Sequence, residues 1–199
     1  MREPSDFAPL LKRREKTRKL LVVFPVMGCL LLVPMCTTHK EEKDPEASSE
    51  NGFSHANSAG IVLKWKADTL EFLHAKVSAP TTGWVAVGFH PTDEMKDANI
   101  IIGYVKDGDV YVTDEFGVGK YSHLPDTLLG GEDNVTNRAG AETVGRTEIS
   151  FTIPLDSGDP YDRPLAVGKS YMVMLAYGPD DADDFQTRHE RRTHLNVKL

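Results

Sequence analysis

The stretch Asn99–Phe116, NIIIGYVKDGDVYVTDEF, decides the fold class because it contains two strand-like segments separated by a turn signal. Both segments are rich in β-branched and aromatic residues, and Asp107-Gly108 between them is a strong signal for a two-residue hairpin turn. Six further segments have a similar pattern, namely Gly60–Ala67, Thr69–Ala79, Gly83–Phe89, Thr147–Leu155, Ser170–Gly178 and Thr193–Leu199. Many short strands without crossover helices predict an all-β fold, an antiparallel β-sandwich of the immunoglobulin-like kind.

The N-terminal 36 residues have the pattern of an export signal. Residues 1–19 contain seven basic residues, and Leu20–Cys36 contains no charged residue. A membrane-spanning helix is the alternative, because this apolar segment has about the minimum length that crosses a bilayer. Cys29 and Cys36 lie where bacterial lipoproteins carry their acylated cysteine. We prefer Cys36 as the lipidation site because it leaves a polar mature start, CTTHKEEK, although Cys29 has the better small residue before it.

Composition divides the chain into three parts: a signal peptide or membrane anchor (1–36), a linker (37–58) and a folded domain (59–199). The linker is polar and rich in Glu, Ser and Asn, which is typical of disordered segments. Because residues 1–19 contribute a charge of +4 to the chain's total of −7, the remainder carries −11. Such an acidic domain argues against nucleic acid as a partner. We expect it to face the periplasm or the exterior, anchored to the membrane of the cell envelope.

Few residues of the folded domain suggest specific chemistry. It contains no cysteine, and it lacks the sequence signatures of serine hydrolases, phosphate-binding loops and zinc proteases. The acidic run Gly178–Asp184 lacks the alternating ligand spacing and the glycine of a calcium loop, so we interpret it as a solvated turn. The longest irregular stretch, His123–Arg146, is predicted to be a loop with a strand near its end.

A methionine and two histidines remain as candidate binding residues. Met95 is a flexible apolar side chain among charged residues, between two predicted strands. If the last strand runs unbroken from about Arg188, His189 lies on the same face as the apolar Leu195 and points inward or into a pocket. His194 then lies on the opposite face and points toward water.

Several segments occur in an order that resembles the DOMON family of β-sandwich domains. These are GWVAVGF (83–89), ANIIIGYVKDGDVYVTDEFG (98–117), EISFTIPL (148–155), GDPYDRPLAVGKSYMVMLAYG (158–178) and DDFQTRHERRTHLNVKL (183–199). In the haem-binding members, iron is held by a methionine after the first of these strands and by a histidine near the C-terminal end. The resemblance implies non-covalent b-type haem with Met95 and His189 as axial ligands. Arg188 departs from bacterial relatives, which often have two adjacent histidines here, so His194 is the fallback ligand.

Two functions follow from this resemblance. The first is a membrane-tethered cytochrome domain that passes single electrons to an exported redox partner, and therefore a carrier rather than an enzyme. The second is a module on the same fold that binds a sugar or another small molecule, or mediates adhesion, with Met95 merely covering the end of the sandwich.

Overall fold

The structure is a computed structural model that describes residues 52–68 and 71–199. Contacts divide the chain into two units, Met1–Glu41 and Glu42–Leu199, and every described residue belongs to the second. The predicted signal or anchor segment, with Cys36 and most of the linker, lies outside the described residues. Within the described ranges, no helix has both the length and the apolar character needed to cross a membrane.

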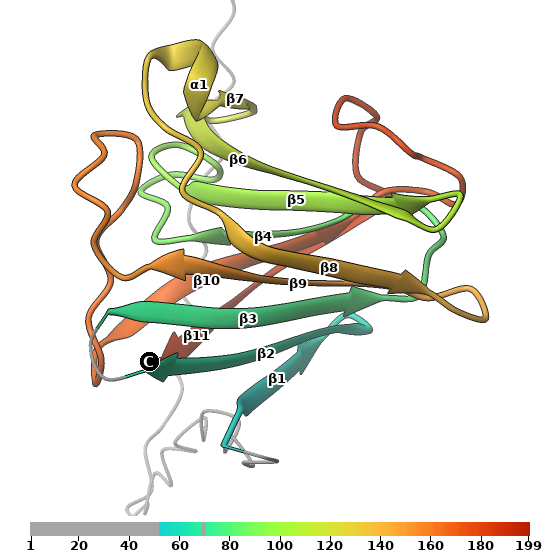
Figure 1. Cartoon of the computed structure of the whole chain (residues 1–199), viewed down its shortest axis with the longest axis horizontal. Coiled ribbons are helices and arrows are strands. Elements are labelled where there is room, and N and C mark those ends of the chain that lie inside the picture. The colour runs from blue at the N-terminus through green and yellow to red at the C-terminus, as the bar shows by residue number, and fades with distance from the viewer. Residues whose placement is uncertain (1–51, 69–70) are drawn as a thin grey trace, which may run out of the picture. The chain divides into compact units, whose positions relative to one another are not determined.

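Two antiparallel sheets pack face to face, which confirms the predicted all-β sandwich (Figure 1). The larger sheet has six strands in the order β11-β10-β4-β5-β6-β7. In chain order these strands are β4 (Val85–Phe89), β5 (Asn99–Lys106), β6 (Asp109–Gly119), β7 (Ser122–Pro125), β10 (Ser170–Tyr177) and β11 (Arg191–Lys198).

The smaller sheet has five strands in the order β1-β2-β3-β9-β8. Its strands are β1 (Ser54–Ser58), β2 (Ile61–Asp68), β3 (Phe72–Ala79), β8 (Thr136–Glu142) and β9 (Thr147–Pro154). Neighbouring strands in both sheets are antiparallel, as expected for a chain without crossover helices.

The hydrophobic core lies between the two sheets and is built by alternation along each strand. In β3, for example, Leu73, Ala75 and Val77 are buried in the core, while His74 and Lys76 point away from it. The larger sheet contributes Val85, Val87 and Phe89 from β4. Since the side-chain period of a strand is two, the residues between them lie on the outer face of that sheet.

The folded domain begins earlier than the boundary predicted at Ala59, because Ser54–Ser58 forms β1. This strand pairs with β2 through a tight turn at Ala59 and Gly60, both of which have positive φ angles. The sequence SHANS contains a single buried residue, Ala56, so its composition resembles that of a linker. Edge strands of this kind are held by backbone pairing, which composition does not reveal.

Two other local predictions are confirmed. Residues Asp107 and Gly108 connect β5 to β6, with Lys106 paired to Asp109 across the turn. The irregular stretch His123–Arg146 contains β8 near its end, as expected. It also contributes most of β7 and the one-turn helix α1 (Asp126–Leu129), which were not predicted.

Candidate functional site

The outer face of the larger sheet has a floor of small and aliphatic residues. Strand pairing aligns Met174 of β10 with Gly88 of β4, and Gly88 with Ile100 of β5. The next row on this face consists of Ala176, Ala86 and Ile102. A Cβ atom at Gly88 would lie 2.5 Å from the Cε atom of Met174, so the absence of a side chain there keeps the floor low.

A pocket of about 510 Å³ lies over this floor. One wall is the segment 178–190, which connects β10 to β11 in the chain and packs on the outer face of the larger sheet. The indole N–H of Trp84 donates to the carbonyl oxygen of Thr187 at 3.1 Å and ties this segment to the sheet. Ala182 and Phe185 from the same segment pack against Trp84 and its neighbours on the floor. The volume is within the ordinary range for a site that binds a small molecule or cofactor.

Met95 enters the pocket from the loop 90–98, between β4 and β5. The Lys96 N–H donates to the carbonyl oxygen of Asp93 at 2.9 Å, and the Ala98 N–H donates to that of Met95 at 3.1 Å. This loop packs closely on β6, since a Cβ atom at Gly117 would lie 1.6 Å from the Met95 carbonyl oxygen. The position of Met95 therefore depends on the absence of a side chain at residue 117.

His189 reaches the same pocket from the segment 178–190 and is half-buried. Burial lowers the pKa of its imidazole, and the positive charges of Arg192 and Arg188 lower it further. The ring is therefore neutral at pH 7, which is the form that binds metals.

The sequence prediction for the two histidines is correct in part. β11 begins at Arg191, so His189 precedes the strand, and it reaches the pocket because its segment crosses the outer face. His194 lies on the outer face and is exposed, as predicted, but this face borders the pocket. Strand parity could not indicate that the pocket lies on the outer face of the sheet. Both histidines and Met95 therefore line one pocket.

Positive side chains lie along one side of the pocket. Arg188 and Arg192 both line it, and Nη1 of Arg192 forms an ion pair with Oε2 of Glu94. Because Glu94 precedes Met95, this ion pair connects the methionine loop to the strand that follows His189.

His123 also lines the pocket and was not predicted to do so. Its Nδ1 is within hydrogen-bond distance of Oε2 of Glu115, a buried residue of β6 on the outer face of the larger sheet. One sequence signal could have indicated this face: Trp84, Ala86 and Gly88 are not polar, although they alternate with the core residues of β4. Strands that are apolar on both faces are covered on both faces.

The acidic run Gly178–Asp184 forms turns, in agreement with the sequence interpretation. An oxygen of Asp180 accepts from the Thr82 N–H at 2.9 Å, and one of Asp184 accepts from the Thr187 N–H at 2.6 Å. These contacts fix the start and end of the pocket wall. These two carboxylates therefore serve as hydrogen-bond acceptors for backbone N–H groups.

Two solved structures share the fold at low sequence identity. The cytochrome b domain of pyranose dehydrogenase from Coprinopsis cinerea aligns with a TM-score of 0.53 at 12% identity, over 73% of this chain and 80% of that chain. The cytochrome domain of cellobiose dehydrogenase from Myriococcum thermophilum aligns with a TM-score of 0.53 at 10% identity, over 74% of this chain and 82% of that chain. At these identities the likeness concerns the fold alone.

The sequence match to a known family covers more than half of the chain. It extends over residues 57–178, from β1 to the end of β10, and includes Met95, whereas His189 lies beyond it. With the sandwich topology, this match shows that the chain belongs to the DOMON domain family.

Proposed function

We propose that this domain binds b-type haem non-covalently in the pocket on the larger sheet, with Met95 and His189 as axial ligands, and that it transfers single electrons. The observation that carries the proposal is that these two residues, 94 positions apart in the sequence, line the same pocket over an apolar floor. The resemblance to haem-binding DOMON proteins names the same pair. The fold shared with two cytochrome domains agrees with this function.

The side chains in the pocket suit such a cofactor. The floor of Gly88, Ala86 and Ala176 is low and apolar, which favours a flat, largely apolar molecule. A neutral imidazole and a thioether are the donors that iron binds in electron-transfer haem proteins. The guanidinium group of Arg188, which lines the pocket, is suited to pair with a carboxylate of the haem propionates.

Bound haem would supply one-electron chemistry, with a potential raised by methionine and histidine ligation. The chain's own residues would set the conditions for it. His189 is kept unprotonated by burial and by its neighbouring arginines, and the ion pair between Arg192 and Glu94 holds the methionine loop. Trp84 and Phe185 keep water from one side of the pocket.

The proposal includes export and tethering, which rest on residues 1–36 alone. Lipidation at Cys36 would leave the linker as a spacer between the membrane and the domain. In that position the natural partner is another exported redox protein. A carrier with both axial positions filled has no open coordination site for a substrate.

The direct test is the absorption spectrum of the purified chain after incubation with haemin. We expect one haem per chain, a Soret band and sharp reduced bands typical of six-coordinate low-spin iron. Met95→Leu and His189→Ala should each give a high-spin spectrum, since each removes one ligand. Met172→Leu is the matched control for the methionine, because Met172 is exposed and does not line the pocket.

The variant His194→Ala tests which of the two histidines, His189 or His194, is the ligand. We expect this variant to keep the low-spin spectrum, whereas conversion to high spin in His194→Ala and not in His189→Ala would show that His194 is the ligand. A folded chain that takes up no haemin would contradict the haem function and favour the sugar-binding or adhesion alternative.

A further inference from the structure

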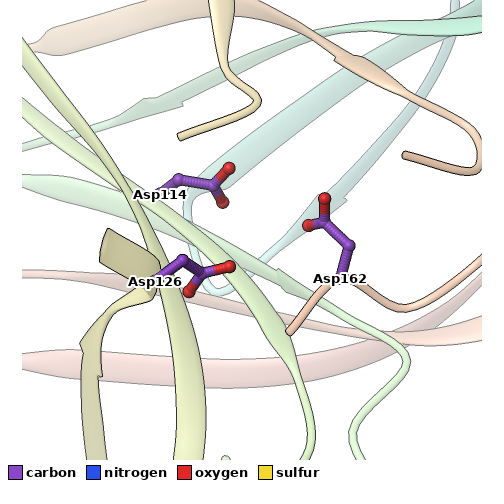
Figure 2. A group of neighbouring side chains, drawn as sticks. All are labelled: Asp114, Asp126 and Asp162. Carbon is purple, nitrogen blue, oxygen red and sulfur yellow. The ribbon is translucent and has the colours of Figure 1, made fainter. Parts of the chain in front are cut away.

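Three aspartates from separate segments meet between the sheets at one end of the sandwich. Asp114 comes from β6, Asp126 from the start of α1, and Asp162 from the loop between β9 and β10. One carboxylate oxygen from each lies within 4.8 Å of the others. Figure 2 shows the three carboxylates directed toward a common space. This cluster lies on the core side of β6, since Asp114 pairs with the core residue Ile101.

The cluster is buried and its polar atoms are incompletely paired. Asp126 is 0% exposed and Asp114 is 2% exposed. Both carboxylate oxygens of Asp126 and one of Asp114 are buried without a hydrogen-bond partner. Buried carboxylates without partners are costly, and native proteins normally satisfy them with a donor, water or ion.

The side-chain amide of Asn99 also has a buried oxygen without a hydrogen-bond partner. Asn99 is 4% exposed, and its Nδ2 group donates to Oδ1 of Asp162, which places the amide in the cluster. Its carbonyl oxygen, Oδ1, is buried without a partner. The amide therefore adds one more buried oxygen without a donor next to Asp162, and a cation would satisfy it together with the unpaired carboxylate oxygens.

The surrounding contacts hold the acidic side chains in place and leave their negative charge uncompensated. The backbone N–H of Asn134 donates to Oδ2 of Asp114 at 2.9 Å, and the Ser157 hydroxyl donates to Oδ2 of Asp162 at 2.5 Å. Burial, followed by the charge of Asp162, raises the pKa of Asp114 to about 8 and that of Asp126 to about 7. The raised pKa values reflect the cost of ionising several buried carboxyl groups close together, a cost that a bound cation would reduce.

We propose that Asp114, Asp126 and Asp162, with the carbonyl oxygen of Asn99, form a Ca²⁺ site. All candidate donors are oxygens, which favours a hard cation over zinc, copper or iron. Two oxygens on opposite sides of one Ca²⁺ ion are about 4.6–5.2 Å apart, so donors within 4.8 Å can share the ion. Mg²⁺ retains several waters and suits a buried, water-poor site less well.

The site is separate from the haem pocket but connected to it through the chain. Asn99 begins β5 directly after the methionine loop, and Asp114 lies three residues before Gly117, on which that loop packs. An ion would join β5, β6, α1 and the loop that carries Asp162. We assign it a structural role, in which it fixes the segments that carry these residues. The site does not depend on haem binding.

The test measures thermal unfolding and isothermal titration calorimetry of the purified chain with CaCl₂ after treatment with a chelator. We expect one Ca²⁺ per chain and a rise in melting temperature of about 5–10 °C at a hundredfold excess over Kd. No calorimetric heat and no rise would overturn the proposal. An equal rise with MgCl₂ at the same concentration would overturn the choice of Ca²⁺.

Asp126→Asn and Asp162→Asn keep the side-chain shape and remove one charge each. We expect each to fold in chelator, because the change lessens repulsion, and to lose the response to Ca²⁺. Asp133→Asn is the matched control: Asp133 is a nearby exposed aspartate paired with Arg138, and its replacement should leave the response intact. Retention of the full response in Asp126→Asn would show that Ca²⁺ binds elsewhere.

Discussion

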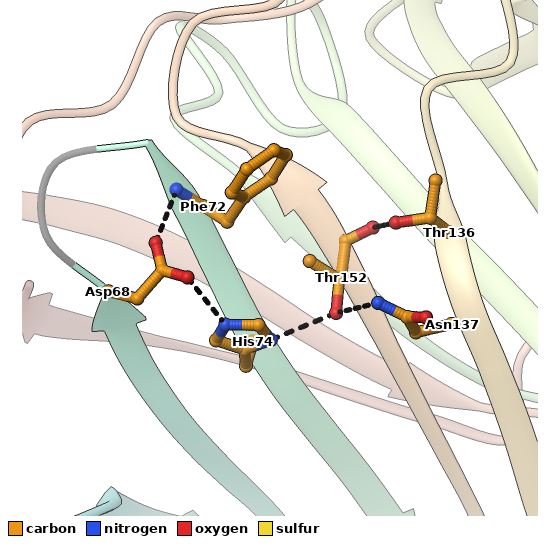
Figure 3. Close-up of polar contacts among 6 residues, drawn as sticks. All are labelled: Asp68, Phe72, His74, Thr136, Asn137 and Thr152. Atoms are coloured by element: carbon orange, nitrogen blue, oxygen red, sulfur yellow. Dashed lines mark hydrogen bonds and ion pairs between the residues drawn. The ribbon is translucent and has the colours of Figure 1, made fainter.

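The two outer faces of the sandwich differ in whether their side chains form hydrogen bonds with one another. On the smaller sheet, Asp68, His74, Thr152 and Asn137 form a chain of hydrogen bonds across neighbouring strands (Figure 3). Nε2 of His74 lies 3.2 Å from Asp68, and its Nδ1 lies 2.9 Å from the hydroxyl of Thr152. A neutral imidazole satisfies both contacts, by donating to the carboxylate and accepting from the hydroxyl.

The larger sheet presents the opposite surface, since glycine, alanine and aliphatic residues occupy its outer face. These residues offer no hydrogen bonds, and they are covered in part by the segment 178–190. The comparison teaches why the proposed ligand is assigned to the larger sheet: its apolar outer face has no hydrogen bonds of its own to satisfy. Side chains on the polar face satisfy one another's hydrogen bonds. An exposed apolar face is instead stabilised when another group covers it and removes it from water.

The largest predicted effect is a loss of haem affinity, and it is expected from a bulky side chain on the floor of the pocket. In Gly88→Leu the new side chain would meet the Cε atom of Met174 and Cγ1 of Ile100. The methionine is flexible, so the sandwich should fold, while the added volume occupies the space for haem. Overpacking of about 1–3 kcal/mol at the bound state predicts roughly 5- to 150-fold weaker haem binding, measured by titration with haemin.

Ser150→Leu is the control for this change on the opposite face. Ser150 lies on the outer face of β9, where it pairs with Lys76. We expect unchanged haem affinity, because this face lies on the other side of the core. Equal losses in both variants would show that the effect arises from general destabilisation and not from the pocket.

The sequence predicted the sandwich because alternation and the hairpin at Asp107 and Gly108 are local signals. It could not predict which outer face holds the pocket, since that depends on where the segment 178–190 folds back over the sheet. The acidic cluster was missed for a similar reason. Asp114, Asp126 and Asp162 are distant in sequence and none belongs to a recognisable ligand motif. The family resemblance named Met95 and His189, and the structure adds that they line one pocket.

A smaller effect is expected from a change behind the methionine loop. In Gly117→Ala the new Cβ atom would overlap the carbonyl oxygen of Met95, which is backbone and must move. We expect about 1–3 kcal/mol lower stability, measured by urea unfolding, and partial conversion of bound haem to the high-spin form. This result would show that the pocket depends on support from the β6 side.

Gly119→Ala tests whether the response is specific to the loop. Its Cβ atom would lie 2.8 Å from the hydroxyl of Ser122, a side chain that can rotate away. The haem spectrum of this variant should match that of the unchanged chain. A high-spin spectrum in Gly119→Ala but not in Gly117→Ala would contradict the role assigned to the contact with Met95.

The smallest effect is expected on the polar face, where Asp68→Asn removes the charge that His74 contacts. The pKa of Asp68 is lowered in the folded chain, mainly by its hydrogen bond with His74. At pH values between the folded and unfolded pKa of Asp68, the unfolded chain therefore binds more protons than the folded chain. The stability that Asp68 contributes is therefore present at neutral pH and is lost as the pH falls through the folded-state pKa. Urea unfolding should show a lower midpoint for Asp68→Asn at pH 7 and a difference that closes as the pH falls through the lowered folded-state pKa of Asp68. Haem affinity should not change, because Asp68 lies on the sheet opposite the pocket. A loss of affinity would show that the two faces are coupled through the core.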